Sequence, residues 1–501
     1  MKILNAKQLS EVDQHTTKEQ GLSDWELMER ASDNAFMELL KYIDITKKVY
    51  LFCGTSNNGG DGLAIARMLH YANVTIEVFE VQYSSSTSEA YQKNLALLED
   101  LNIEVKSLRC KEDLPDLRQA KVIVDAIFGV GLNRRMPDFI QELVQHINTS
   151  KAKVISIDVP SGMYIEQAIS SVEQIIHSDI CLSFQLPKLA FLLPSTGSHV
   201  ENFRLIDIGL SLEKIEQIQT PYHYLTMKEM APLLKKRNKF SHKGTYGNAL
   251  LIGGQQGMFG SVVMSSMACL RSGVGKVYTH LDTKGQVVLN QHSLESIYVE
   301  DCLANLASEV NYNAVGIGMG LGTSAHALQL VEAAFHYQSK GLLLDADAIS
   351  LLSKHTRLIE LISKYSVLTP HLGELQRLIG SWANDFEMLT KVREFCLNHQ
   401  VIVVVKGAHT LICDGKNYYF NSTGNPGLAK AGTGDALSGI ITALLAQNFP
   451  ALVACQLGVF LHGLAADLAL ETQSEQSLIA TDVIEKLPKA FQLLEEKNMF
   501  K

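Results

Sequence analysis

The residues best suited to chemistry lie near the end of the chain, in a run of small residues. This run reads Asn425-Pro426-Gly427-Leu428-Ala429-Lys430-Ala431-Gly432-Thr433-Gly434-Asp435, and an apolar stretch over residues 436–446 follows it. Small residues at the start of a helix leave backbone N–H groups free to converge on a transferring phosphoryl group. Asp435 beside them could take a proton from an attacking hydroxyl. The alternative is that Gly-Thr-Gly-Asp is a plain helix cap.

Three further polar segments follow apolar runs in this half of the chain. Lys406-Gly407-Ala408-His409-Thr410 comes after residues 401–405 and is consistent with a loop that touches the phosphate or ribose of a nucleotide. The segments Asp345-Ala346-Asp347 and Pro370-His371-Leu372-Gly373-Glu374 could help to bind substrate or Mg²⁺. Each of the three is equally well explained, when taken alone, as a turn or a cap.

The first half has its own glycine-rich segment, Gly54-Thr55-Ser56-Asn57-Asn58-Gly59-Gly60-Asp61-Gly62, between an expected strand at 49–53 and an expected helix at 63–71. Adjacent glycines let backbone N–H groups approach a phosphate, and the start of the helix adds positive potential. The segment therefore predicts phosphate binding. The alternative is a Gly/Asn-rich capped turn with nothing bound.

Two acids in the first half come directly after apolar strands. Asp125 begins the run Asp125-Ala126-Ile127-Phe128-Gly129-Val130-Gly131-Leu132-Asn133-Arg134, and Asp158 begins Asp158-Val159-Pro160-Ser161-Gly162. Strand ends of a parallel sheet meet at one edge, so these loops are expected to converge. Asn58, Asp125 and Ser161 then offer oxygen ligands for a small cation, which leaves Asp158 for proton transfer. Separately, each acid could be a turn cap.

The elements that must position these residues alternate between strand and helix. Residues 3–40 are expected to be helical, with Ser23 and Glu26 spaced as a capping box. Continuous apolar strands that alternate with helices predict mostly parallel sheets covered on both faces, an α/β fold. The expected strands are 49–53, 74–81, 103–105, 122–124, 154–157, 180–184 and 203–206, and then 249–252, 276–278, 314–317, 342–344, 367–368 and 401–405.

The length of 501 residues is too great for one ordinary core and predicts two to three domains. Residues 211–221 carry no strand signal and end in proline, which makes them the best linker candidate. The domain boundary is therefore expected near residues 215–222.

Composition excludes several classes of protein. The net charge is −9, and no basic run is longer than Lys235-Lys236-Arg237, so nucleic acid is not an expected partner. The eight cysteines form no C-x-x-C pair and are expected to be reduced packing residues. The N-terminus becomes polar too soon for a signal sequence, and no apolar stretch is expected to reach the length of a membrane span. These features predict a soluble cytoplasmic protein without a membrane partner.

Several catalytic signatures are absent from the sequence. The run Gly316-Ile317-Gly318-Met319-Gly320-Leu321-Gly322 lacks the G-x-G-x-x-G spacing. No G-x-x-x-x-G-K-[ST], G-x-S-x-G or H-E-x-x-H occurs. The chain is therefore not expected to be a Walker-type NTPase, a serine hydrolase or a zinc protease.

Taken together and in this order, the motifs closely resemble those of the bifunctional NAD(P)H-hydrate repair enzymes over nearly the whole chain. His242-Lys243-Gly244-Thr245-Tyr246-Gly247 adds to the resemblance. It implies a Rossmann-like, doubly wound epimerase domain at 1–215 and a ribokinase-like ADP/ATP-dependent dehydratase domain at 222–497. The first would interconvert the R and S hydrates at C6 of the nicotinamide ring. The second would phosphorylate the C6 oxygen of the S hydrate, after which the ring nitrogen expels phosphate.

The resemblance also implies roles for particular residues. Asp158 would be the catalytic acid or base of the epimerase and contact its substrate, and Asn58, Asp125 and Ser161 would bind K⁺. The remaining epimerase substrate contacts would be Asn57, Asn58, Gly59, Gly60, Asp61, Gly129, Val130, Gly131, Leu132, Asn133, Arg134 and Arg135.

In the dehydratase, Asp435 would activate the C6 hydroxyl. Substrate would contact Ser261, Gly320, Gly322, His371 and Asp435. The donor, usually ADP in the fused prokaryotic form and otherwise ATP, would enter with Mg²⁺ and contact Lys406, Gly407, Ala408, His409, Thr410, Gly432, Thr433 and Gly434. The substrates would be the hydrates of NADH and NADPH, and a homo-oligomer is expected.

The sequence departs from the family pattern at four positions: Lys430 and Ala431 replace Thr and Gly, Leu372 replaces a proline, and Ser261 replaces an alanine. A cation at 430, beside the anion hole, could strengthen donor binding or obstruct it. Two other functions stay open at this point. The second half could be a small-molecule kinase that releases a stable phosphate ester, and residues 1–215 could be a binding module that senses dinucleotide or a protein without catalysis.

Overall fold

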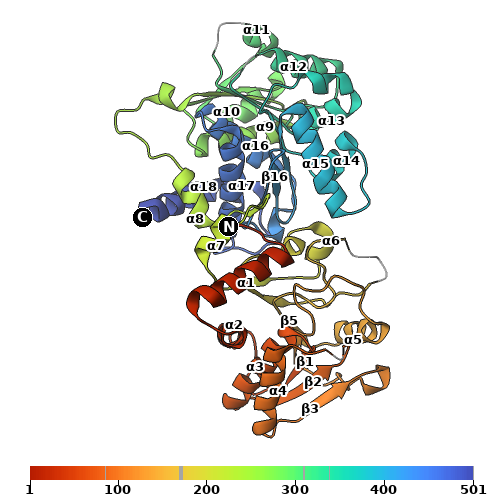
Figure 1. Cartoon of the computed structure of the whole chain (residues 1–501). Helices are drawn as coiled ribbons and strands as arrows, with labels where there is room; N and C mark the ends of the chain where they lie inside the picture. Colours follow the sequence, from red (N-terminus) through yellow and green to blue (C-terminus); the bar gives the residue numbers. More distant parts are fainter. Residues whose placement is uncertain (85, 169–172, 308–310, 338, 500–501) are drawn as a thin grey trace. The chain divides into compact units, whose positions relative to one another are not determined.

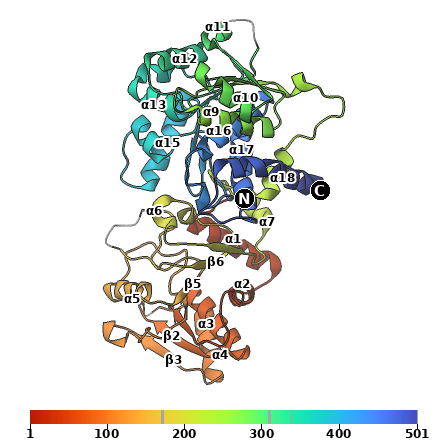
Figure 2. The same ribbon diagram turned by 180° about the vertical axis from the view of Figure 1, so that it is seen from behind.

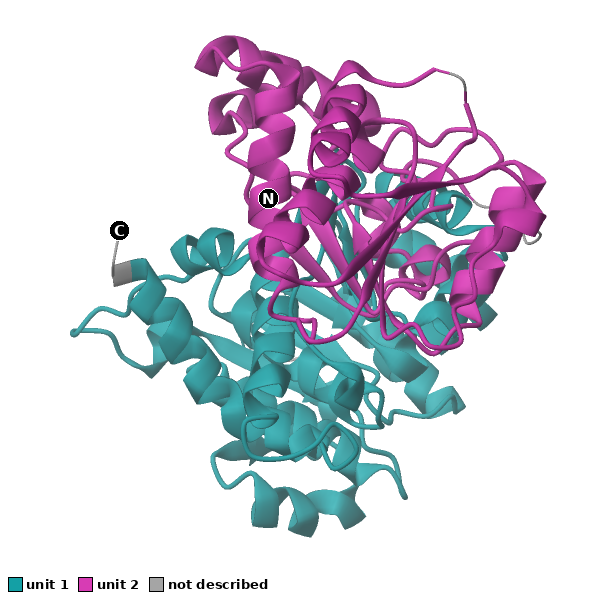
Figure 3. Cartoon of the chain, turned by 90° about the horizontal axis from the view of Figure 1, so that it is seen from below, with its two compact units in different colours: residues 1, 221–501 teal, residues 2–220 magenta. Residues whose placement is uncertain are grey.

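The computed structural model describes residues 1–84, 86–168, 173–307, 311–337 and 339–499. The chain folds into two compact units (Figure 3). Residues 2–220 form one unit, called the N-unit below, and residue 1 with residues 221–501 forms the other, called the C-unit.

The N-unit is built on a seven-stranded sheet with the order β3-β2-β1-β4-β5-β6-β7, in which every pairing is parallel. This pattern is that of a doubly wound α/β sheet, as the apolar strands predicted. The strands are β1 (Val49–Cys53), β2 (Ile76–Val81), β3 (Val105–Leu108), β4 (Val122–Ala126), β5 (Lys153–Ile157), β6 (Ile180–Phe184) and β7 (Phe203–Ile206).

Helices cover both faces of this sheet: α2, α3 and α4 pack together on one face and α5 lies on the other (Figure 1). The helices are α1 (Ala6–Gln20), α2 (Asp24–Leu39), α3 (Asn57–Tyr71), α4 (Glu89–Asp100), α5 (Asp138–Asn148), α6 (Pro194–Gly197) and α7 (Leu212–Gln217), with 3₁₀ turns at Lys111–Asp113 and Leu189–Phe191. The expected capping box is present, because Ser23 and Glu26 bond each other's backbone N–H at the start of α2.

The C-unit contains a ten-stranded sheet with the order β11-β10-β9-β12-β13-β14-β15-β16-β17-β8. Only the β15–β16 and β16–β17 pairings are antiparallel. The strands are β8 (Tyr222–Tyr224), β9 (Asn248–Ile252), β10 (Lys276–His280), β11 (Ser296–Tyr298), β12 (Ala314–Ile317), β13 (Gly341–Leu344), β14 (Val367–Leu368), β15 (Ile402–Val405), β16 (Leu411–Cys413) and β17 (Tyr418–Phe420).

Two groups of helices cover this second sheet (Figures 1 and 2). Helices α9, α16, α17 and α18 share one hydrophobic core with strands of the sheet, whereas α12, α13, α14 and α15 lie on the other side. The helices are α8 (Met227–Met230), α9 (Phe259–Arg271), α10 (Gln286–His292), α11 (Cys302–Leu306), α12 (Ala325–His336), α13 (Ala346–Lys354), α14 (Leu372–Ile379), α15 (Asp385–His399), α16 (Thr433–Ala446), α17 (Ala451–Ala469) and α18 (Ala480–Met499), with 3₁₀ turns at Ala231–Leu233, Lys243–Tyr246, Thr283–Gly285, Thr356–Leu361 and Pro426–Leu428.

Several sequence-based expectations about the elements need correction. Helix α3 starts at Asn57, inside the glycine-rich segment rather than at residue 63, and α16 starts at Thr433 rather than at residue 436. The segment expected to be a linker contains α7. Strands β8, β11, β16 and β17, each three residues long, were not predicted.

The expectation that no apolar stretch reaches membrane-span length was also wrong. Helix α17 has 19 residues and a mean hydropathy of 1.6 over its most apolar window. Buried residues make up 67% of that window, so the apolar character serves packing inside the C-unit. Seven of the eight cysteines are buried packing residues as expected, whereas Cys110 is exposed.

Candidate active sites

A cavity of about 1010 Å³ opens in the N-unit at the carboxyl ends of its strands. Helix α1 forms one wall, and the loop that follows β4 forms another. Its lining includes most of the residues predicted to bind the first substrate: Asn57, Asn58, Asp61, Gly129, Val130, Gly131, Leu132, Asn133, Arg134, Arg135 and Asp158.

The open end of α3 faces this cavity. The first backbone bond of the helix runs from Gly60 N–H to the Ser56 carbonyl (3.0 Å), and no side chain caps the helix. The N–H groups of residues 57–59 therefore precede the hydrogen-bonded ladder and lie at the positive end of the helix dipole. Such a terminus suits a phosphate or pyrophosphate group.

The glycines of this segment have a second role, in packing. A Cβ on Gly59 would lie 1.8 Å from the Gly54 carbonyl oxygen, and one on Gly60 would lie 2.7 Å from the Met28 sulfur. Neither glycine is among the cavity-lining residues. Close approach of α3 to the end of β1 therefore requires Gly59, whether or not its N–H group also binds substrate, whereas the contact at Gly60 is with the flexible end of the Met28 side chain.

Asp125 lies beneath the cavity, fully buried at the end of β4. Its carboxylate accepts hydrogen bonds from the hydroxyls of Ser156 and Ser161 and from the backbone N–H of Ser161 (2.8 Å). Burial raises the pKa of Asp125 against the lowering effect of these bonds. The structure therefore brings Asp125 and Ser161 together, as the sequence predicted.

Asn58 lies in the first turn of α3 with 7% of its surface exposed. Neither its amide oxygen nor its amide nitrogen has a hydrogen-bond partner among the described residues. A buried amide without a partner is costly, so this side chain is suited to an additional ligand.

Asp158 follows β5 with a backbone φ of +63°, a left-handed conformation that non-glycine residues adopt at a cost. Its carboxylate lies 3.0 Å from the ammonium of Lys188, which is 1% exposed. That ammonium also donates to the Ser183 hydroxyl and to the carbonyls of Phe184 and Leu186. Asp158 is thus held in a fixed position at the cavity by a fully buried cation.

Two other acids lie close to Asp158. Asp61 accepts the Ser32 hydroxyl at 2.9 Å, and burial together with repulsion from Asp158 and Asp13 raises its pKa well above the usual range. Asp13 projects from α1 into the cavity, and burial and the charge of Asp158 raise its pKa to about 6.

In the C-unit, the corresponding open helix end belongs to α16. Its first backbone bond runs from Ala436 N–H to the Gly432 carbonyl (3.0 Å), and no side chain caps it. The N–H groups of Thr433, Gly434 and Asp435 therefore lie at the uncapped end. A Cβ on Gly434 would lie 3.4 Å from the Lys406 ammonium, so a cation stands directly beside this helix end.

Asp435 occupies a partly desolvated position in the first turn of α16. Burial and the nearby charge of Asp345 raise its pKa to about 6, while the Ser261 hydroxyl and Lys406 lower it. A carboxylate with a pKa near neutrality is suited to general-base catalysis.

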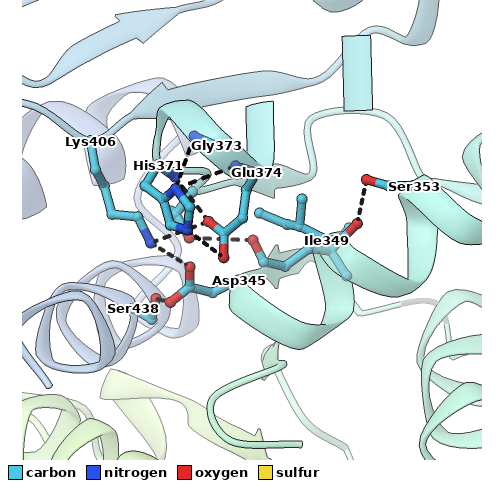
Figure 4. Close-up of polar contacts among 10 residues, drawn as sticks. Asp345, Ile349, Ser353, His371, Gly373, Glu374, Lys406 and Ser438 are labelled. Carbon is cyan, nitrogen blue, oxygen red and sulfur yellow. Dashed lines mark hydrogen bonds and ion pairs between the residues drawn. The ribbon is translucent and has the colours of Figure 1, made fainter. Parts of the chain in front are cut away.

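Lys406 is held by two buried carboxylates (Figure 4). Its ammonium lies 2.8 Å from Asp345 and 3.9 Å from Glu374. Burial would lower the pKa of Lys406, but these two acids outweigh it and raise that pKa. The second Asp345 oxygen accepts the Ser438 hydroxyl at 2.7 Å, so Asp345 connects Lys406 to α16.

His371 stands at the start of α14, next to Glu374 (Figure 4). Its backbone N–H donates to Glu374 at 2.9 Å, and its ring nitrogen Nδ1 accepts the N–H groups of Gly373 and Glu374. The ring is about half exposed, and its Nε2 lies 3.5 Å from a Glu374 carboxylate oxygen.

The loop after β12 lies against the start of α9. A Cβ on Gly320 would lie 3.1 Å from Ser261 Cβ, and Gly322 N–H donates to Asp347 at 2.8 Å. Because the Ser261 hydroxyl hydrogen-bonds Asp435, the predicted substrate contacts Ser261 and Gly320 lie close to the predicted base.

Some predicted residues point elsewhere. The His409 ring contacts the Asn421 carbonyl at 3.0 Å, and burial lowers its pKa. Thr410 closes a turn by donating to the Gly407 carbonyl, and Ala408 is exposed in that turn. Lys430 donates to the Gln476 carbonyl, in the segment before α18.

Sequence reasoning missed Asp13, Lys188 and Ser438. Lys188 is the single charge in the apolar run of residues 186–193, which was a detectable signal. Asp13 and Ser438 lie inside helices, where no sequence pattern showed which side would face a ligand.

Comparisons with known proteins agree with this division. Residues 249–489 match the family model described as NAD(P)H-hydrate dehydratase, and residues 25–190 match that described as YjeF-related protein N-terminus. The bifunctional NAD(P)H-hydrate repair enzyme Nnr of Coxiella burnetii is 33% identical, over 94% of this chain and 95% of the relative. The enzyme of the same name from Dictyoglomus turgidum is 29% identical over the full length of both chains. A crystal structure of a ribokinase-like superfamily protein from Enterococcus faecalis superposes with a TM-score of 0.50 at 28% identity, over 55% of this chain and 98% of that one.

Proposed function

Because this chain belongs to the bifunctional NAD(P)H-hydrate repair enzymes, we propose that its two halves carry the two steps of the repair. Residues 1–215 epimerise the R and S hydrates of NADH and NADPH. Residues 222–497 dehydrate the S hydrate at the expense of ADP or ATP.

One observation carries the dehydratase assignment: the Asp435 carboxylate, with a pKa of about 6, stands at the uncapped end of α16 beside Lys406. We infer that the N–H groups of residues 433–435 and the Lys406 ammonium bind the transferring phosphoryl group. Asp435 takes the proton of the C6 hydroxyl, the C6 oxygen attacks the terminal phosphorus, and the donor loses that phosphoryl group. Phosphate is a better leaving group than hydroxide, so the N1 lone pair then expels it to form an N1=C6 iminium. Loss of a proton from C5 to water or to the released phosphate forms the C5=C6 bond and restores the dihydronicotinamide.

The remaining donor and substrate contacts are proposed from the family motif. Gly407 and Ala408 lie in an exposed turn after β15, which suits contact with the donor. Gly320 lies against Ser261, which hydrogen-bonds Asp435, and His371 pairs with Lys406 through an isolated β-bridge. Both residues suit contact with the nicotinamide end of the hydrate. Because the His409 ring is directed inward, its contact with the donor is assigned to the backbone rather than to the ring.

The epimerase assignment is supported by the cavity of about 1010 Å³, which is ample for a dinucleotide. The open end of α3 suits the pyrophosphate, and Asp158 at the same cavity suits proton transfer at C6. The loop of Gly129, Val130, Gly131, Leu132, Asn133, Arg134 and Arg135 completes the wall around the substrate.

Potassium fits the N-unit on a structural observation: the Asn58 amide is buried without a partner among the described residues. Asn58, Asp125 and Ser161 would hold the ion with oxygen atoms, and its charge would help to hold the anionic substrate in place. Replacing KCl by choline chloride in the epimerase assay should lower activity in the parent chain. The same change should have no effect on an Asn58→Leu variant.

Magnesium does not fit a protein cage in the C-unit. The described residues contain no cluster of three or more His, Cys, Asp or Glu side chains that could hold a metal ion. Asp345 and Glu374, the acids nearest the donor loop, are engaged by Lys406. No step of the proposed reaction passes through Mg²⁺, which would enter with the nucleotide and be held by its phosphates.

A mixture of R and S hydrates, supplied with each donor in turn, tests both activities at once. Full consumption of both epimers with formation of NADH and free phosphate is the expected result. Asp435→Ala should abolish this recovery while epimerisation persists. A persistent phosphate ester would instead show a small-molecule kinase, and unchanged consumption of R hydrate in Asp158→Ala would show that the N-unit is only a binding module.

We also propose a cytoplasmic homo-oligomer, to be tested by cell fractionation and sedimentation.

A further inference from the structure

Helix α1 presents one face to the epimerase cavity. Ala6, Ser10 and Asp13 all line it, and their spacing of four and then three residues places them on one side of a helix. Asp13 is the only acid in this set. None of the motifs that define the two active sites includes α1, so its carboxylate has no assigned role.

The Asp13 carboxylate lacks a structural role as well. No described residue donates a hydrogen bond to it or forms an ion pair with it, although most of the side chain is removed from solvent. Other acids on the helices around this site do have partners: Asp61 accepts the Ser32 hydroxyl, and Glu11, on the outer side of α1, pairs with Lys214. A partly desolvated carboxylate that faces a substrate cavity without a partner is a candidate for chemistry.

The charged groups around Asp13 come from several elements. Asp158 follows β5 and Asp61 lies in α3, and both are acids. Lys188, which follows β6, is the nearest buried cation, but its ammonium is bound to Asp158, and Asp24 of α2 adds a weaker repulsion. The result is a difference between two carboxylates at one cavity: Asp158 is ion-paired, whereas burial and Asp158 raise the pKa of Asp13 to about 6.

We propose that Asp13 is the second acid–base group of the epimerase, which protonates the C6 hydroxyl while Asp158 removes a proton from water on the other face of the ring. This inference rests on the proposed epimerase function and adds a residue to it. Both carboxylates line the cavity and come from different elements, α1 and the loop after β5, and reaction at both faces of the ring requires two separate acid–base groups.

The step balances without a redox partner. Asp13 gives its proton to the C6 hydroxyl, the C6–O bond breaks, water leaves, and the lone pair of N1 forms an N1=C6 iminium. A second water molecule adds to C6 from the opposite face, Asp158 takes its proton, and the electron pair returns to N1. One water leaves and one enters, and proton exchange with solvent resets the two acids. In the reverse direction the two acids exchange roles.

The test uses the full chain, with R hydrate as substrate and chromatographic separation of the epimers. In Asp13→Asn, kcat for R-to-S conversion should fall about 100-fold or more with little change in KM. Dehydration of S hydrate by the C-unit should stay unchanged. The matched control is Glu11→Gln, which removes an acid from the outer face of the same helix and should epimerise at the parent rate.

Two measurements on the parent chain keep the inference testable if Asp13→Asn fails to fold. The kcat/KM of the parent chain for R hydrate should fall as the pH rises above about 6, because the acid form of Asp13 is lost. In water labelled with heavy oxygen, each epimerised molecule should gain the label at C6. A flat pH profile, retention of the original oxygen, or an Asp13→Asn variant as fast as Glu11→Gln would each overturn this inference alone. A parent chain that dehydrates S hydrate but never converts R hydrate would overturn the epimerase function along with it.

Discussion

The ammonium of Lys406 lies 2.8 Å from the carboxylate of Asp345, and the other oxygen of that carboxylate accepts the hydroxyl of Ser438 in α16. Asp345 is 1% exposed, so this pair is largely shielded from water. The contact fixes the position of a lysine beside the uncapped end of α16. We therefore propose that Asp345 acts through Lys406 as a positioning residue, whereas its place after a strand had suggested only that it could help to bind substrate or Mg²⁺.

Asp345→Asn should weaken use of the phosphoryl donor. The amide can still accept the Ser438 hydroxyl, but it no longer attracts the Lys406 ammonium, which then loses its fixed position. We expect kcat/KM for ADP or ATP to fall about 10- to 100-fold, corresponding to the roughly 1.5–3 kcal/mol of a hydrogen bond to a charged group. Steady-state kinetics with varied donor will measure it, with epimerase activity as the internal control. An unchanged KM and kcat for the donor would contradict the positioning role.

Dehydration should depend on pH through Asp435. Its pKa is raised to about 6, and the base form is the reactive one, so the rate should rise as the pH increases through about 6 and level off above it. The measurement is kcat/KM for S hydrate over about pH 5 to 8 at saturating donor. A rate that falls over this interval would mean that Asp435 acts in its protonated form.

Ser261→Ala should move this pH profile upward. The Ser261 hydroxyl lowers the pKa of Asp435, whereas burial and the charge of Asp345 raise it. Removal of the hydroxyl should therefore raise this pKa further. A hydrogen bond of about 1 kcal/mol corresponds to a shift of roughly half a unit to one unit toward higher pH. The rate at the upper plateau should be close to that of the parent, since the base is then fully ionised in both. Ser261 replaces an alanine of the family pattern, so the variant also restores the usual residue.

Gly59→Ala should destabilise the N-unit. The added Cβ would lie 1.8 Å from the Gly54 carbonyl oxygen. Because the nearest atoms all belong to the backbone of Gly54, no side-chain movement can relieve the clash. We expect a loss of at least about 1–3 kcal/mol in the free energy of unfolding. The control is Gly131→Ala in the cavity loop, where a Cβ meets nothing within 4 Å. Thermal melts of the two variants should separate clearly, and equal melting temperatures would contradict the packing argument.

The sequence predicted the fold well because both sheets use strands whose residues are apolar on both faces. Strands such as β1 and β4 are fully or almost fully buried, and their composition alone separates them from the helices. Strands β16 and β17 escaped prediction because pairing with each other and with β15 and β8 stabilises them, and such pairing leaves no local pattern of the required length.

The residues of the candidate sites were predictable where a motif follows a strand. They were less predictable inside a helix, where the face on which a residue lies decides whether it reaches the site. The residues Asn58, Asp125, Asp158 and Ser161 meet at one edge because parallel strands end there. The direction of a side chain was not predictable, as Lys430 and His409 show. Lys430 bonds the carbonyl of Gln476, which lies 46 residues further along the chain. The His409 ring contacts the carbonyl of Asn421, which follows β17.

The first turn of α3 combines its open N–H groups with Gly59, which has no room for a side chain. Attempts to engineer tighter or altered dinucleotide recognition by randomising residue 59 should yield mostly insoluble protein, because a larger residue would displace the helix before affinity can improve. The loop of residues 129–135 is the better starting point for a library, since Gly131 has free space around it and the loop lines the same cavity.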